Sequence, residues 1–214
     1  MSILIYSDKL DLYKELISAG ELIKEHFGGD IIGIVIGASN AGEVDKIKNL
    51  GLSKIIVYNS PELSNYNPMT YLRAIQEAVN EFKARYVLMN TNYKNKILGG
   101  LIASRINAGL IVDISKLTIE DGKIIAEKPV YSGKALAKEE ISGDKAVLLI
   151  KPGVFKPKEE GSQSEVIEKT IDLSGLNLEL TEFIPKTVEE GIKLDEADVV
   201  IGGGRGIRQK EDLE

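Results

Sequence analysis

The chain has 214 residues, of which 43% are hydrophobic and 28% charged, a balance typical of a globular protein with a substantial core. It contains no cysteine, which excludes disulfides, thiolate metal sites, iron–sulfur clusters and thiol nucleophiles and is typical of a reducing cytoplasm. Its net charge is −6 with both signs interspersed, and no apolar run approaches the ~18 residues of a membrane span, so we expect a cytoplasmic protein that neither binds nucleic acid nor inserts into a membrane.

The first half of the chain alternates short apolar runs with helical patterns. The runs are rich in isoleucine and valine and have the composition of strands that are buried on both faces of a parallel sheet. They are Ile3–Tyr6, Ile31–Ile36, Lys54–Tyr58 and Tyr86–Met89. Repetition of strand and helix predicts a doubly wound, mostly parallel Rossmann-like sheet of the adenine-nucleotide-hydrolase type.

Helix start and stop signals lie between these runs. Ser7 or Asp8 is a suitable cap for a first helix, whose apolar stripe is Leu12, Leu16, Ala19 and Ile23. A short second helix begins at Asn40, which forms a possible capping box with Glu43, and Gly51 suits the left-handed position after its end at Leu50.

Two further helices are predicted with asparagine at their starts. Asn67 precedes Pro68, which suits the first helical position, and an apolar stripe follows at Leu72, Ile75, Val79 and Phe82. Residues 92–106 form the fourth helix, with Leu98, Leu101, Ile102 and Ile106 facing inward.

The helical period is absent from Gly109 to Phe155. Short alternating runs are separated there by turn signals at Asp121-Gly122, Ser132-Gly133 and Gly143-Asp144, which predict antiparallel hairpins that extend the sheet. A solvated polar loop at 156–162 follows.

Beyond that loop we expect strands at 165–173 and 178–184 and a connector at 187–191. A last apolar run, Asp198–Ile201, predicts a strand that ends in a glycine-rich turn. The expected division is an amino-terminal α/β domain, 1–185, and a linker with the first strand and turn of a second domain, 186–214.

The glycine-rich turn, residues 202–207, is the most distinctive motif. Its backbone can approach a ligand closely because no Cβ intervenes, its amides can face an anion, and Arg205 adds a planar positive charge. The spacing fits neither the dinucleotide-binding G-x-G-x-x-G pattern nor a Walker A loop. From composition alone, a bare turn at the end of a strand is the favoured interpretation, because glycine turns are common and usually bind nothing.

Residues 194–207, with Glu196-Ala197-Asp198, an apolar strand and Gly202-Gly203-Gly204-Arg205-Gly206, resemble the start of the second domain in electron transfer flavoprotein α subunits. Three other stretches resemble the same family in order and spacing. They are 103–114 within 91–117, the hairpin Pro129–Lys134, and the run Lys151–Phe155.

The resemblance implies an electron carrier without catalytic residues of its own. Its FAD would sit in the second domain, with Arg205 over the flavin ring and Gly204 allowing the close turn, so that the guanidinium stabilises the charge gained on reduction. It also implies an electron transfer flavoprotein β subunit as partner, flavin dehydrogenases as electron donors and a membrane quinone reductase as acceptor. The amino-terminal domain would then be structural and subunit-docking.

The sequence departs from this family in two places. The remaining FAD contacts of the second domain have no counterpart, so we expect this chain alone to bind FAD weakly or not at all. The family's Gly-Arg-Asp is replaced by Lys94-Asn95-Lys96, at a place where a partner contact is expected.

Two other classes of function stay open. A stand-alone adenine-nucleotide-binding module would hold its ligand at the carboxyl ends of the strands, near Gly37–Asn40. A small enzyme has less support, because the only histidine, His26, lies at a helix end and suits a cap or a solvated side chain. Asp8, Asp113 and Asp121 lack the spacing of metal ligands.

Overall fold

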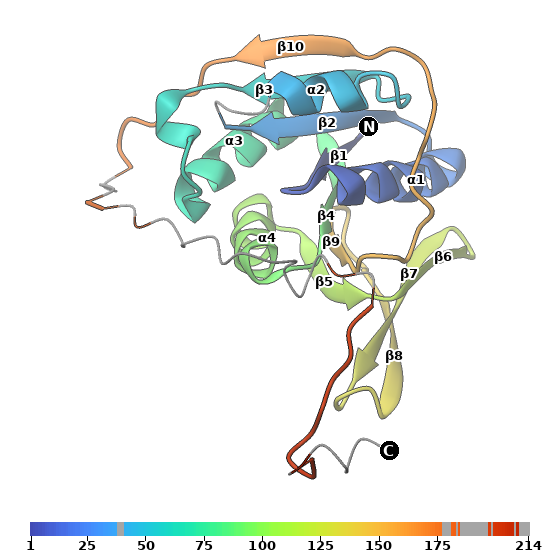
Figure 1. The fold of residues 1–214 in the computed structure, drawn as a ribbon. Coiled ribbons are helices and arrows are strands. Elements are labelled where there is room, and N and C mark those ends of the chain that lie inside the picture. The colour runs from blue at the N-terminus through green and yellow to red at the C-terminus, as the bar shows by residue number, and fades with distance from the viewer. Residues whose placement is uncertain are drawn as a thin grey trace. The chain divides into compact units, whose positions relative to one another are not determined.

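The computed structural model describes residues 1–37, 41–176, 181–182, 184, 197, 199–207 and 209. The chain divides into two compact units, Met1–Leu176 and Asn177–Glu214. The helices and strands found in the described part all belong to the first unit (Figure 1). The expected domain boundary at 185 stays a prediction, because it falls outside the described residues.

A seven-stranded parallel sheet forms the centre of the first unit, in the order β10-β3-β2-β1-β4-β9-β5. The four predicted apolar runs are confirmed as its first four strands. The strands are β1 (Ser2–Tyr6), β2 (Asp30–Ile36), β3 (Lys54–Tyr58), β4 (Ala84–Asn90), β5 (Gly109–Ile114), β9 (Ala146–Ile150) and β10 (Glu165–Lys169).

The direction of winding reverses beside β1. The chain passes from β1 to β2 to β3 on one side, and then places β4 on the other side of β1, with Tyr6 opposite Met89. Such a reversal is the topological switch point of a doubly wound sheet, where the carboxyl ends of two neighbouring strands diverge. The Rossmann-like prediction is therefore confirmed.

Helices cover both faces of this sheet (Figure 1). Side chains alternate along each strand, so that Ile3 and Ile5 of β1 belong to a core with α1, whereas Leu4 and Tyr6 belong to a separate core with α3 and α4. The helices are α1 (Leu10–Phe27), α2 (Ala41–Ile47), α3 (Pro68–Glu81) and α4 (Tyr93–Ile106), with a 3₁₀ turn at Pro61–Leu63.

The predicted starts of α3 and α4 are confirmed, and in both helices the asparagine is the N-cap. The Asn67 side chain accepts a hydrogen bond from the Met69 amide at 2.9 Å, and Asn92 accepts one from the Asn95 amide at 2.7 Å. Gly51 has the expected left-handed φ of +87°, but α2 ends at Ile47 and not at the predicted Leu50, so Gly51 lies in the turn beyond the helix end. Asn40 lies outside the described residues, so its capping box stays a prediction.

The predicted cap of the first helix is wrong. The helix begins one residue later, with Lys9 at the N-cap position and without a side-chain cap bond. The Ser7 hydroxyl instead contacts the Lys9 backbone, and the Asp8 carboxylate accepts hydrogen bonds from Asn90 and Asn92. Hydrogen bonds to residues distant in sequence thus replace the local cap that Asp8 was predicted to form on α1.

Residues 109–155 combine two arrangements. Antiparallel hairpins are confirmed for β6 (Lys116–Glu120), β7 (Lys123–Val130) and β8 (Ala135–Glu140), which form a separate three-stranded sheet. The flanking strands β5 and β9 differ from the prediction, because they pair in parallel within the large sheet. The apolar run of β9 is fully buried on both faces, which only an interior strand allows.

The predicted solvated loop at 156–162 is confirmed, since all its residues are exposed except the half-buried Lys158, and it contacts α1 at two places. Ser18 donates to the Lys156 carbonyl at 2.7 Å, and Lys158 forms an ion pair with Glu21 at 2.8 Å. Gly161 lies so close to Gly51 that an added Cβ would meet the Gly51 nitrogen at 2.4 Å. This segment carries the chain to the far edge of the sheet, where β10 confirms the first part of the strand predicted at 165–173.

Candidate functional site

The glycine-rich motif forms a turn within the second unit. Arg205 and Gly206 occupy the turn, and the Ile207 amide donates to the Gly204 carbonyl at 3.1 Å. A Cβ on Gly203 would meet the Ile207 side chain at 2.9 Å, whereas a Cβ on Gly204 or Gly206 would have no neighbour within 4 Å. The Ile207 atom is the end of a flexible side chain that can move aside, so none of these three positions requires glycine for the geometry of the turn itself.

Arg205 projects from this turn as an exposed side chain. Within its own unit it makes no hydrogen bond or ion pair to a described residue. A fixed guanidinium beside two open glycines can pair with an anion or cover a flat ring, because no side chain of the turn blocks the approach. The expected role of Arg205 and Gly204 at a flavin stays a prediction.

The strand predicted before this turn is not formed by its described residues. Val199, Val200 and Ile201 have no strand assignment and are exposed by 78%, 55% and 96%. An extended segment becomes a strand only when a neighbour satisfies its backbone groups, and the described residues provide none. Leu178–Ile184 and Thr187–Gly191 lie mostly or wholly outside the described residues.

A polar network lies at the switch point, at the carboxyl ends of β1 and β4. The Asp8 carboxylate accepts hydrogen bonds from the side-chain amides of Asn90 and Asn92, each at 3.0 Å. The amide of Asn95 donates to both the carbonyl and the side-chain oxygen of Asn90, at 3.0 and 2.9 Å. The protein's own side chains therefore bridge the crevice where a nucleotide would be expected.

This network carries negative charge next to a tyrosine cluster. Burial raises the pKa of the Tyr6, Tyr66 and Tyr71 hydroxyls, and the charge of Asp8 raises it further. Their rings meet edge to face at 6.1 and 5.0 Å, so these tyrosines act as packing groups. A carboxylate in this place repels phosphate groups, which disfavours the nucleotide-binding alternative. Residues 38–40 of the predicted loop lie outside the described part.

The replacement Lys94-Asn95-Lys96 has internal roles. Asn95 is buried in the network, Lys96 forms an ion pair with Asp113 at 2.7 Å, and Lys94 lies 5.2 Å from the centre of the Tyr66 ring. These contacts hold the start of α4 against its neighbours.

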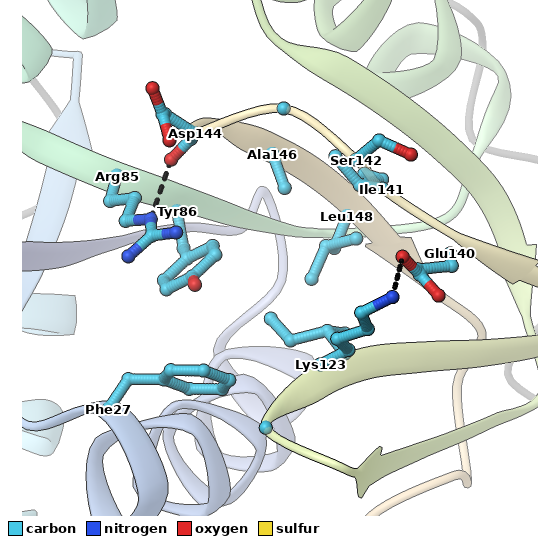
Figure 2. A pocket seen from close by; sticks show the side chains of 13 residues that line it. Phe27, Arg85, Tyr86, Lys123, Glu140, Ile141, Ser142, Asp144, Ala146 and Leu148 are labelled. Atoms are coloured by element: carbon cyan, nitrogen blue, oxygen red, sulfur yellow. Dashed lines mark hydrogen bonds and ion pairs between the residues drawn. The ribbon is translucent and has the colours of Figure 1, made fainter.

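A second concave region, at the amino edge of the sheet, was missed by sequence reasoning. It is a cavity of about 360 Å³, called here the amino-edge cavity, and its walls come from α1, β4, β7, β9 and the connection from β8 to β9 (Figure 2). No local sequence motif predicts this cavity, because the residues that line it are spread between positions 27 and 148 of the chain.

The remaining candidates have structural roles. His26 is exposed in the last turn of α1, with Nδ1 at 3.0 Å from the Leu22 carbonyl, as its helix-end position predicted. Asp121 and Gly122 both have positive φ in the tight turn between β6 and β7. Among the described residues no group of three acidic, histidine or cysteine side chains is arranged to hold a metal ion. A search of the same residues finds no helix that could span a membrane.

Comparison with known proteins gives a consistent result. A family profile described as the electron transfer flavoprotein domain matches residues 11–174. The electron transfer flavoprotein subunit alpha of Megasphaera elsdenii is 30% identical, over 94% of this chain and 61% of its own length. The corresponding subunit of Syntrophomonas wolfei is 29% identical over 85% of this chain and 58% of its own length. That of Bacillus subtilis is 28% identical over 92% and 60%.

The chain thus spans about three fifths of the length of the curated relatives it matches. The matched residues include β2 to β10, and hence most of the large sheet and all of the hairpin sheet. The three relatives named above are electron transfer flavoprotein α subunits. Because the match covers well over half of the sequence, the chain belongs to the electron transfer flavoprotein family.

Proposed function

We propose that this chain is the amino-terminal α/β domain of an electron transfer flavoprotein α subunit, followed by the opening segment of an FAD-binding domain. The family match over 11–174, together with the exposed arginine of the glycine-rich turn, is the observation that carries the proposal. In this assignment the first unit is structural and docks the β subunit.

FAD, when bound by the complete protein, stores the electrons that are carried between partners. Arg205 would lie over the flavin ring, where its permanent positive charge favours the form that carries extra negative charge. Gly204 would allow the backbone to approach the ring, because it has no Cβ and, apart from its chain neighbours, no described residue has an atom within 4 Å of the place where a Cβ would stand. The family's other FAD contacts have no counterpart among the residues of this chain.

The partners follow from the same assignment. Flavin dehydrogenases would donate electrons and a membrane quinone reductase would accept them, so that the chain contributes docking and electrostatics and makes or breaks no substrate bond. The route of each electron then depends on which partner occupies the flavin-binding side of the complex.

Apolar side chains on α4 and β5 support a docking role for the first unit. Tyr93 and Ile97 are exposed by 83% and 47% on one face of α4, and Leu110 of β5 packs against the same helix beside Gly99. Strand β5 is also an edge strand, with β9 on one side only. An edge with apolar side chains beside it is a surface that a partner subunit can cover.

Co-expression with the β-type subunit of the same organism tests the assignment. We expect the two chains to co-elute as a complex in size-exclusion chromatography. Ile97→Lys should weaken that complex, whereas the control Leu136→Lys, on exposed β8, should leave it intact. If no complex forms even when the α subunit is completed with its flavin-binding region, the proposal is wrong.

The role of Arg205 is tested in the completed α subunit with its β subunit. Arg205→Ala should lower the flavin reduction potential, and Arg205→Lys should restore part of it, because charge returns without the planar fork. Spectroelectrochemical titration measures both. An unchanged potential in the alanine variant, with FAD still bound, would exclude Arg205 from the flavin site.

Tight binding of AMP or ATP by this chain alone, measured by calorimetry, would instead favour a nucleotide-binding module.

A further inference from the structure

The geometry points to a ligand site in the amino-edge cavity, separate from any flavin site, that takes a small organic monoanion with an aromatic body, such as an aryl carboxylate. The cavity lies wholly in the first unit, and the proposed function does not use it. Its volume of about 360 Å³ is at the lower end of the range for small-molecule sites, which is roughly 300–1,000 Å³.

The floor of the cavity is apolar and rigid. Leu148 and Ala146 of β9 are 0% and 2% exposed, and Tyr86 of β4 is 5% exposed, so all three are held by the core. The Phe27 ring, at the end of α1, lies 5.9 Å from the Tyr86 ring (Figure 2). Two aromatic rings beside aliphatic side chains form a surface against which a flat apolar body can pack.

The Tyr86 hydroxyl gives this floor a polar group. It makes no hydrogen bond to any residue in the described part of the chain, although the side chain that carries it is 95% buried (5% exposed). Burial raises the pKa of this hydroxyl, so it is a proton donor at neutral pH. The hydroxyl oxygen itself is not among the buried polar atoms that lack a partner, so it reaches the open space of the cavity, where a ligand oxygen can accept its hydrogen bond.

Arg85 provides the charge. Its Nε donates to the Asp144 carbonyl at 2.7 Å, and its guanidinium carbon lies 5.5 Å from the centre of the Tyr86 ring, which together fix its position (Figure 2). Its terminal nitrogens make no hydrogen bond to a described residue. They can therefore bind a carboxylate through two parallel hydrogen bonds next to the tyrosine hydroxyl.

The other charged groups at the rim limit the ligand to one negative charge. Lys123 is already paired with Glu140 at 2.9 Å, so that pair is close to neutral. Asp144 contributes a carboxylate on the same side as Arg85 (Figure 2). With the Lys123–Glu140 pair neutral and Asp144 offsetting Arg85, the rim has no surplus positive charge, so one ligand carboxylate can use the free donors of Arg85 whereas a second negative charge would have no cation to pair with.

Calorimetric titration of the full chain with naphthalene-2-carboxylate tests the site, with naphthalene-2-carboxamide as a neutral probe of the same shape. We expect the carboxylate to bind about tenfold more tightly than the carboxamide, which is roughly what one charge-assisted hydrogen-bonded pair contributes. Amide chemical shifts should change at residues 85–86, 123–124 and 140–148.

Variants locate the contacts. Arg85→Gln should remove the preference for the carboxylate, whereas Arg73→Gln, the same change on α3, should keep it. Tyr86→Phe keeps the ring and should weaken both probes about threefold to fivefold through loss of one hydrogen bond. Thermal unfolding confirms that each variant is folded; if Arg85→Gln is not, the phenylalanine variant decides. Equal affinity for the two probes, shift changes elsewhere, or no binding at millimolar concentration would overturn the proposal.

Discussion

The two edges of the central sheet differ in how their polar groups are satisfied. At the carboxyl edge, Asp8, Asn90, Asn92 and Asn95 bind one another across the switch point. At the amino edge, the Tyr86 hydroxyl and the ends of Arg85 face a cavity. Doubly wound sheets bind ligands at the carboxyl edge as a rule, whereas the amino-edge cavity lies at the opposite edge.

The reason for the difference is what the chain places against each edge. The carboxyl edge is bridged by short side chains that suit one another as donors and acceptors. The amino edge is overhung by β7 and by the connection from β8 to β9, which form a wall at a distance from the floor (Figure 2). A separate sheet beside the main one thus creates space that the helices alone would fill.

The largest effect is expected from the floor of the amino edge. Leu148→Ala should lower the free energy of unfolding by about 3 kcal/mol, because a fully buried side chain is lost and the rigid strands cannot close the gap. Urea denaturation measures this loss. Leu136→Ala, which changes a 68% exposed side chain, is the control and should cost under about 0.5 kcal/mol. A small loss for Leu148 would mean that the floor is not rigid.

The network at the carboxyl edge should give the next largest effect. Asn90→Ala should cost about 2 kcal/mol, since the buried Asn95 amide loses an acceptor and Asp8 loses a donor. Asn92→Ala removes a half-buried cap and should cost about 1 kcal/mol. Equal losses for the two variants, measured by urea denaturation, would show that burial of the network contributes nothing.

Two tyrosine hydroxyls provide a finer comparison. The Tyr13 hydroxyl donates to the Ile5 carbonyl at 3.0 Å, so Tyr13→Phe should cost about 1 kcal/mol. Tyr86→Phe should change stability by less than about 0.5 kcal/mol, because its hydroxyl bonds to no described residue. Thermal unfolding of both variants at one pH compares them. A clear loss for Tyr86→Phe would reveal a partner for that hydroxyl.

The smallest effect concerns alkaline pH. Burial raises the pKa of Tyr86 above its ordinary value of 10.0, and the charge of Arg85 opposes part of that rise. Above pH 10 the unfolded chain therefore loses this proton before the folded chain does, and the contribution of Tyr86 to stability declines as pH rises. Tyr86→Phe should reduce that decline. Arg85→Gln should raise the pKa of Tyr86 further, and NMR of the tyrosine Cζ carbons measures it; a fall would contradict the assigned effect of Arg85.

Local signals predicted much of the fold. Isoleucine-rich runs marked β1 to β4, and asparagine with the right spacing marked the starts of α3 and α4. These succeeded because burial on both faces and backbone capping depend on residues close in sequence. The prediction of Asp8 as a helix cap was wrong, since its hydrogen-bond partners Asn90 and Asn92 are more than eighty positions away in the sequence.

Pairing of distant strands was beyond local reasoning. The run at Ala146–Ile150 follows a hairpin and suggested another, yet it inserts between β4 and β5 as a parallel strand. Its position depends on its pairing with β4 and β5, which are distant in sequence, and no nearby residue specifies that pairing. The amino-edge cavity is a consequence of this placement.

By itself, the sequence determined the alternation of strands and helices, the starts of α3 and α4, the hairpins and the motifs that point to electron transfer flavoproteins, because each is encoded in neighbouring residues. The tertiary structure alone decided the strand order and the hydrogen-bond network at the carboxyl edge. It also decided that Phe27, Arg85, Tyr86, Lys123 and Leu148 line one cavity. Those features depend on contacts between segments far apart in the chain, whose formation is governed by the packing of the whole core.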